Sequence, residues 1–135
     1  SWLKNVTAHL KKDLKKTKYY VVLGDFNIAP EDADVYDPEA WKDKILCSKK
    51  ERLSLKKIFD LGFKDTFRIF PQEKEMFSWW DYRTGAFRRN RGLRIDLILA
   101  NNNLANKCIK SYIDFEPRKN ERPSDHTPVV SIFDI

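Results

Sequence analysis

Histidine, cysteine and methionine are scarce in this 135-residue sequence, and each shortage narrows the chemistry available to it. The two histidines, His9 and His126, confine imidazole chemistry to two positions. The two cysteines, Cys47 and Cys108, are isolated and lack the spacing of a metal site. Unpaired cysteines of this kind are typical of reduced thiols, so we expect a cytoplasmic protein.

Long apolar runs are also missing. No stretch approaches the length of a membrane span, and none has the pattern of a signal peptide, so we expect no membrane partner. The only methionine is the internal Met76, and Trp2 and Leu3 already belong to a helical pattern. We expect from this that the chain is a piece of a longer polypeptide.

What the sequence does have is a cationic surface and enough apolar residues for a core. The net charge of +6 and the pI near 9.3 permit nucleic acid or an anionic membrane as a partner without proving either. Hydrophobic residues make up 41% of the chain and aromatic residues 13%. One domain with a buried core is expected at this length.

Two segments have the apolar period of an amphipathic helix. The first covers residues 3–14, where we interpret His9 as a surface or boundary residue. The second begins with the S-x-x-E capping box of Ser48 and Glu51, and Gly62 is placed to end it. Between these helices the sequence predicts a solvated acidic loop over 30–38 and a short helix over 39–46. After them it predicts a connection with a helical turn over 63–68.

The apolar run Tyr19–Leu23 has the composition of a strand and ends at a possible site. Gly24 removes the Cβ that would crowd the turn, and Asp25 and Asn27 follow. The acid can hold a hard cation or a water, while the amide can donate to an anion. The alternative for these two residues is an Asx turn that only closes the strand.

A second apolar run, residues 93–99, is interrupted by Asp96. A buried acid needs a partner that offsets its desolvation, so Asp96 is either structural or orients a histidine. His126 follows Asp125 just before a further predicted strand over 129–133, and another strand is predicted over 108–115. Three consecutive residues cannot form a serine triad, so a general base His126 with Asp125 near a metal fits better.

The segment from Met76 to Tyr82 is too aromatic for an ordinary loop. Trp79 and Trp80 are adjacent and would face opposite sides of a strand, so one can be core while the other lines a pocket. The basic stretch that follows suits stacking on exposed sugars or bases together with phosphate contacts, although a charged hairpin explains it equally well. Its arginines are Arg83, Arg88, Arg89, Arg91 and Arg94.

Four of these stretches together resemble the exodeoxyribonuclease III type of abasic-site endonuclease, in the endonuclease/exonuclease/phosphatase superfamily. They occur in the family's order, and the third favours the DNA-repair branch over the phosphatase branches. The stretches are Leu23–Pro30 (G-D-x-N), Phe77–Arg83 (the abasic-pocket segment), Asn90–Asp96 (R-G-x-R-I-D) and Ser124–His126 (S-D-H).

The resemblance implies an α/β fold with one layer pair, in which a mixed sheet of about five strands has helices on one face. This equals half of a four-layer, DNase I-like sandwich. It also implies roles. Asp25 would activate water or transfer a proton, Asn27 would stabilise a phosphorane-like transition state, and Asp96 would orient His126, which acts on the phosphate or as base. The resemblance further implies that Asp125 would bind Mg²⁺ or Mn²⁺ together with Asp25, Asn27 and His126. The residues it implies for DNA binding are Trp79, Trp80, Arg88, Arg89 and Arg91.

Only the C-terminal half of the family's domain is resembled, by residues 1–135. The family's N-x-N-G strand, its principal glutamate ligand and its catalytic tyrosine have no match, and Gln72–Glu73 lies in a polar loop and cannot replace them. We expect a magnesium-dependent DNA-repair nuclease that cuts double-stranded DNA at abasic sites and works at 3′ ends as a 3′-5′ exonuclease and 3′-phosphatase. The fragment alone is expected to be inactive and to self-associate through the sheet face that the missing half would cover. The alternatives are a nucleic-acid-binding or dimerising half-domain without catalysis, and a phosphoinositide-type phosphatase.

Overall fold

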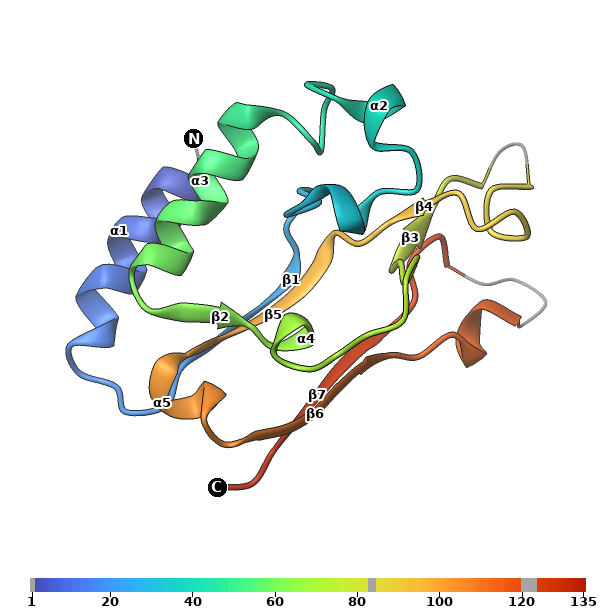
Figure 1. The fold of residues 1–135 in the computed structure, drawn as a ribbon. Helices are drawn as coiled ribbons and strands as arrows, with labels where there is room; N and C mark the ends of the chain where they lie inside the picture. Colours follow the sequence, from blue (N-terminus) through green and yellow to red (C-terminus); the bar gives the residue numbers. More distant parts are fainter. Residues whose placement is uncertain (1, 83–84, 120–123) are drawn as a thin grey trace.

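The computed structural model describes residues 2–82, 85–119 and 124–135 (Figure 1). In chain order the helices and strands are α1 (Trp2–Leu14), β1 (Val21–Asp25), the 3-10 turn η1 (Asp32–Asp34), α2 (Pro38–Trp41), α3 (Lys49–Asp60), β2 (Phe63–Asp65), α4 (Thr66–Ile69), β3 (Trp79–Trp80), β4 (Gly92–Leu93), β5 (Asp96–Asn101), α5 (Asn102–Ala105), β6 (Cys108–Ile113), the 3-10 turn η3 (Glu116–Lys119) and β7 (Val129–Phe133).

The predicted α/β class is confirmed, and the strands fall into three hydrogen-bonded groups. β1, β5 and β2 form an antiparallel sheet with β5 in the centre, while β3 pairs with β4 and β6 with β7. Side-chain hydroxyls connect the first group to the last. Thr66 donates to the Ile98 carbonyl at 2.8 Å and contacts Ser131 at 2.6 Å, and Ser131 contacts Ser111 at 2.9 Å.

The helices α1 and α3 lie side by side on one face of the three-stranded sheet (Figure 1). Their apolar stripes, including Leu3 and Leu10 from α1 and Leu55 and Ile58 from α3, are buried against Leu97 and Leu99 of β5 and their neighbours. Both predicted amphipathic helices are therefore confirmed.

The predicted ends of α3 are also present. The Ser48 hydroxyl accepts from the Glu51 amide at 3.1 Å, and the Glu51 carboxylate accepts from the Ser48 amide at 3.4 Å. Gly62 follows the helix with a φ of +108°, a conformation that a side chain would strain.

The other face of β1 is uncovered in this chain. Alternate residues of a strand point to opposite faces, and Val21 and Leu23 point away from the helices. Leu23 is 64% exposed and Val21 is 41% exposed. An exposed apolar strand face is unusual in a soluble monomer and indicates a surface that another segment covers.

Three local predictions are corrected by the structure. The helix predicted over 39–46 is limited to Pro38–Trp41, because Asp43 and Leu46 take left-handed conformations with φ of +59° and +77°. The connection 63–68 holds the predicted helical turn but begins with an unpredicted strand, β2. The segment 116–122, whose charged residues predict a surface loop, begins with the turn η3, in which Arg118 is buried; residues 120–123 lie outside the described part.

The acidic loop 30–38 is not wholly solvated, because Asp34 is 0% exposed. Its carboxylate accepts from Arg94 at 2.7 Å and from Arg68 at 2.5 Å, and Arg94 also forms a two-bond pair with Asp65. Burial alone would lower the pKa of Arg94, but the charges and hydrogen bonds of Asp65 and Asp34 outweigh it and raise that pKa. Arg94 is therefore a structural cation and not part of a DNA-contacting loop.

Within the described ranges, none of the helices combines the length and the apolarity that crossing a membrane requires.

Candidate active site

Asp25 and Asp96 lie opposite each other where the β1–β5 pair ends. Gly24, with a φ of +139°, and Asn27, with a φ of +53°, turn the chain away from the sheet. The Asn27 amide donates to Asp25 Oδ1 at 2.9 Å. The Asx turn considered as the alternative is thus present, and it fixes the Asp25 carboxylate at the edge of the site.

The segment that carries His126 is held against β3 by backbone contacts. His126 forms an isolated antiparallel bridge with Trp79. On either side, the Trp80 amide donates to the Asp125 carbonyl at 3.0 Å, and the Thr127 amide donates to the Ser78 carbonyl at 2.8 Å. These bonds bring the C-terminal histidine to the end of the β1–β5 pair.

Asp25, Asp96 and His126 form one cluster, in which one ligand atom from each lies within 4.8 Å of the others. His126 Nδ1 is 2.8 Å from Asp96 Oδ2, and His126 Nε2 is 3.6 Å from Asp25 Oδ2. The hydrogen bond on Nδ1 sets the ring orientation and leaves Nε2 turned toward Asp25. Because the Asp96 carboxylate can only accept a hydrogen bond, this contact favours the tautomer with the proton on Nδ1.

The environment shifts both partners of this hydrogen bond. Burial raises the pKa of Asp96, while hydrogen bonds from His126 and Ser78 oppose the shift. For His126, burial alone would lower the pKa, but the hydrogen bond with Asp96 and the negative charges of Asp96, Asp25 and Asp125 raise it overall. The imidazole therefore holds a proton more strongly than a free histidine does.

Ser78 is a site residue that the sequence interpretation did not assign. It is fully buried, and its hydroxyl donates to Asp96 Oδ2 at 2.8 Å. Ser78 Oγ also accepts from the Ile95 and Asp96 amides at 3.1 Å each. Ser78 thus holds both the backbone and the carboxylate of Asp96. The only sequence signal for it is a lone hydroxyl in an aromatic segment.

Asp125 lies beside the cluster and is not one of its three grouped residues. Its Oδ2 accepts from Trp79 Nε1 at 3.1 Å, and its Oδ1 is 3.9 Å from His126 Nε2. Asp125 therefore connects the half-buried indole of Trp79 to the imidazole.

The two neighbouring tryptophans have different environments, as their alternation along a strand requires. Trp80 is 1% exposed, packs its edge against Phe87 and donates from Nε1 to Asn90. A Cβ on Gly92 would come within 2.5 Å of Trp80 Nε1, so a glycine is required there. Trp80 has no free surface for DNA in this conformation, which leaves Trp79 as the residue of the pair that can meet a ligand.

The arginines of the predicted DNA-contacting stretch also divide. Arg88, Arg89 and Arg91 are exposed on the loop between β3 and β4, whereas Arg94 is buried between β4 and β5. Arg83 lies outside the described residues.

The donor set suits a divalent cation. Carboxylate oxygens are the ligands that Mg²⁺ and Mn²⁺ prefer, and the imidazole nitrogen adds a ligand that Mn²⁺ accepts more readily. Asp25, Asp96 and His126 are the grouped side chains that could hold the cation, with Asn27 and Asp125 adjacent. Asp96 is thus a possible ligand that the predicted metal set did not include. When bound, it would neutralise charge on phosphate oxygens. Magnesium takes six ligands, so the remaining positions would belong to water, substrate or another segment.

An acid–imidazole–acid cluster with ligands for a divalent cation can transfer protons and neutralise charge on a phosphate ester. Residues 2–126 match the endonuclease/exonuclease/phosphatase family, and the chain belongs to that family.

Similar proteins include exodeoxyribonuclease III of Haemophilus influenzae, 37% identical over 96% of this chain and 51% of the relative. Among solved structures, a 3′ phosphatase from Neisseria bound to a product DNA hairpin is 42% identical with a TM-score of 0.96, and an AP endonuclease from Archaeoglobus fulgidus is 38% identical with a TM-score of 0.90. Each alignment covers 99% of this chain and 52% of the other. The chain thus has the DNase I-like fold and spans about half the length of the relatives it matches.

Proposed function

We propose that this chain forms half of a divalent-cation-dependent nuclease of DNA repair, which hydrolyses phosphodiesters at abasic sites and acts at 3′ ends as a 3′-5′ exonuclease and 3′-phosphatase. The observation that carries the proposal is the arrangement of His126 between two acids, with Nδ1 hydrogen-bonded to Asp96 Oδ2 at 2.8 Å and Nε2 lying 3.6 Å from Asp25 Oδ2. The names of the relatives, which include an exodeoxyribonuclease III, an AP endonuclease and a 3′ phosphatase, support this choice of substrate.

Each residue has a separate task in this proposal. Asp96 fixes the imidazole so that His126 Nε2 faces the phosphate. The raised pKa of His126 suits an imidazolium that donates to a phosphate oxygen. Asp25, whose carboxylate is held by the Asn27 amide, takes the proton from an attacking water. The Asn27 side chain donates to the developing negative charge.

Catalysis requires a further segment. The three clustered residues give too few ligands for a firm magnesium site, and the apolar face of β1 around Leu23 is uncovered. A second segment that covers this face can supply the missing ligands at the same time. We therefore expect the chain alone to bind magnesium weakly and to have little or no nuclease activity.

The test is reconstitution. The purified chain is mixed with the portion of the Haemophilus exodeoxyribonuclease III that it does not match, and cleavage of an abasic duplex is measured with Mg²⁺. The mixture should cleave, whereas each part alone and the mixture in excess chelator should not. His126→Gln should reduce the rate by roughly 10²- to 10⁴-fold, the usual contribution of an acid–base group. His9→Gln is the matched control, since His9 is exposed and, among the described residues, pairs with Asp13 alone, on its own helix.

The same mixture separates the alternatives. Retention of full activity by His126→Gln would refute the assigned role. Tight binding of DNA without cleavage would favour a binding module, and hydrolysis of inositol phosphates in place of DNA would favour a phosphoinositide-type phosphatase.

The DNA contacts are tested separately. Arg89→Ala or Arg91→Ala in the reconstituted protein should weaken binding to intact and abasic duplexes equally and reduce the salt slope by about one counterion per lost phosphate contact. Trp79→Ala should impair binding of abasic DNA more than of intact DNA, because its indole is the one with free surface. Equal losses on both duplexes would remove Trp79 from the abasic pocket.

A further inference from the structure

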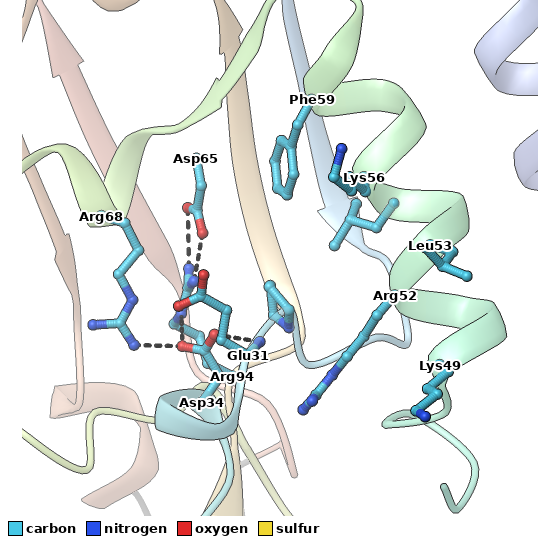
Figure 2. A pocket seen from close by; sticks show the side chains of 12 residues that line it. Glu31, Asp34, Lys49, Arg52, Leu53, Lys56, Phe59, Asp65, Arg68 and Arg94 are labelled. Atoms are coloured by element: carbon cyan, nitrogen blue, oxygen red, sulfur yellow. Dashed lines mark hydrogen bonds and ion pairs between the residues drawn. The ribbon is translucent and has the colours of Figure 1, made fainter.

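A cavity of about 520 Å³ lies between α3, the turn η1 and the β2–α4 corner (Figure 2). Its volume is within the range of small-molecule sites, roughly 300–1,000 Å³. No residue of the Asp25–Asp96–His126 cluster lines it. The cavity is thus separate from the candidate active site and has no part in the function proposed above.

One wall of the cavity is a fixed network of charges. Arg94 binds Asp65 with two hydrogen bonds and Asp34 with a third, and Arg68 donates to the same Asp34 oxygen. The other Asp34 oxygen accepts from the Glu31 amide at 3.1 Å. Both acids are therefore paired, and they offer a ligand little negative charge. The network makes this wall rigid.

The opposite wall is cationic. Lys49, Arg52 and Lys56 recur every three or four residues along α3 and line the cavity from that helix (Figure 2). Arg52 is held in place by the Ala29 carbonyl at 3.0 Å and by Asp32 at 2.9 Å. Lys49 has no hydrogen bond or ion pair to any residue that the structure describes. Five cations and three acids line the cavity. Asp34 and Asp65 are paired with arginine, Arg52 is paired with Asp32, and Lys56 is paired with Asp60, so the charge of Lys49 is the one left for a ligand among the described residues of this wall.

The space between the walls is apolar. Pro30, Leu55 and Phe59 line it, and Figure 2 shows the Phe59 ring at the upper end of the α3 wall. An aromatic side chain at the edge of a cavity favours a flat ring as its partner. Glu31, on the side of η1, adds a carboxylate that can accept from a hydroxyl or amino group.

We propose that this cavity binds a small molecule that combines a flat apolar ring with one anionic group, a phosphate or a carboxylate. The ring lies against Pro30, next to the Ala29 carbonyl that holds Arg52, and the anionic group lies near Arg52 and Lys49. The exposed donors of Lys49 carry the anion selectivity, because the charges on the opposite wall are already paired.

The test is a titration of the ¹⁵N-labelled chain, followed by the amide shifts. Deoxyadenosine monophosphate represents a nucleotide ligand, and 4-hydroxybenzoate represents an aromatic carboxylate. At least one should give saturable shifts over residues 49–59 and 65–68, with a dissociation constant of about 1 mM or lower. Inorganic phosphate and deoxyadenosine, which each lack one half of the pattern, should bind more weakly. Which probe binds better identifies the source of the anionic group.

Lys49→Glu and Lys50→Glu form a matched pair, since both remove one exposed lysine of the same helix turn and only Lys49 lines the cavity. Lys49→Glu should weaken the binding of the better probe about fivefold, the scale of an exposed ion pair turned into a repulsion, and Lys50→Glu should leave it unchanged. The proposal is overturned if neither probe gives saturable shifts, if the shifts centre on 25–27 and 124–127, or if the two variants behave alike.

Discussion

Replacing Arg94 by methionine is expected to destabilise the fold severely, although Arg94 is not part of the candidate active site. Its guanidinium is 1% exposed and compensates Asp34, which is 0% exposed, and Asp65. Breaking a buried charge pair by removing one partner costs about 3–5 kcal/mol, because the other charge stays buried without compensation. A domain of this size has a total stability of roughly 5–15 kcal/mol, so Arg94→Met removes between about a fifth of it and all of it.

The measurement is urea unfolding at fixed protein concentration. With a slope of roughly 2 kcal/mol per molar urea, a loss of about 4 kcal/mol lowers the midpoint by about 2 M. Arg68→Met is the matched control, because Arg68 pairs with the same carboxylate but is 33% exposed. It should cost about 1 kcal/mol or less.

Comparable losses for the two arginine variants, or an unchanged midpoint for Arg94→Met, would show that the network around Asp34 does not stabilise the fold in this way.

Three other predictions concern residues described above. Ser78→Ala should lower the cleavage rate of the reconstituted protein by about tenfold or more at an unchanged KM, the effect of losing a hydrogen bond to a charged group; an unchanged rate would count against its positioning role. Cys108, which is partly exposed, should react with a thiol reagent in the native chain. Its reaction should speed up with pH because the thiolate is the reactive form, and this increase should come at higher pH than for a free thiol because burial raises the pKa of Cys108. Cys47, which is buried and whose pKa burial also raises, should react only after unfolding, and simultaneous labelling would contradict this. The isolated chain should self-associate in sedimentation experiments, and Leu23→Glu should reduce this while Leu53→Glu, on exposed α3 surface, should not.

Features that depend on local sequence could be predicted. The capping box of Ser48 and Glu51 lies within four residues, and the apolar stripes of α1 and α3 repeat within each helix. The strand β2 could not be predicted because its three residues, Phe63–Asp65, are too few to show a period. The alternation of Trp79 and Trp80 predicted that they differ, but which one is buried depends on Gly92, which belongs to another strand.

The contacts that sequence patterns missed are between distant segments. Asp34 and Arg94 are 60 residues apart, and no periodic pattern marks either as the partner of the other. Ser78 and Asp96 are 18 residues apart and meet because β3–β4 pairing places them together. By contrast, Asp96 and His126 could each be predicted as site residues from the sequence, because a buried acid needs a partner and the chain has few histidines. The fold then brings them together.

The backbone bridge between Trp79 and His126 limits how the substrate preference of this protein can evolve. The residue with free surface for a DNA lesion and the residue proposed to act on the phosphate are backbone neighbours, and Asp125 joins their side chains. A substitution that changes the abasic pocket proposed at Trp79 is therefore expected to displace the imidazole of His126 as well. New substrate preferences should arise more readily through Arg88, Arg89 and Arg91 in the loop between β3 and β4. Their exposed side chains can be exchanged without displacing the residues of the candidate active site.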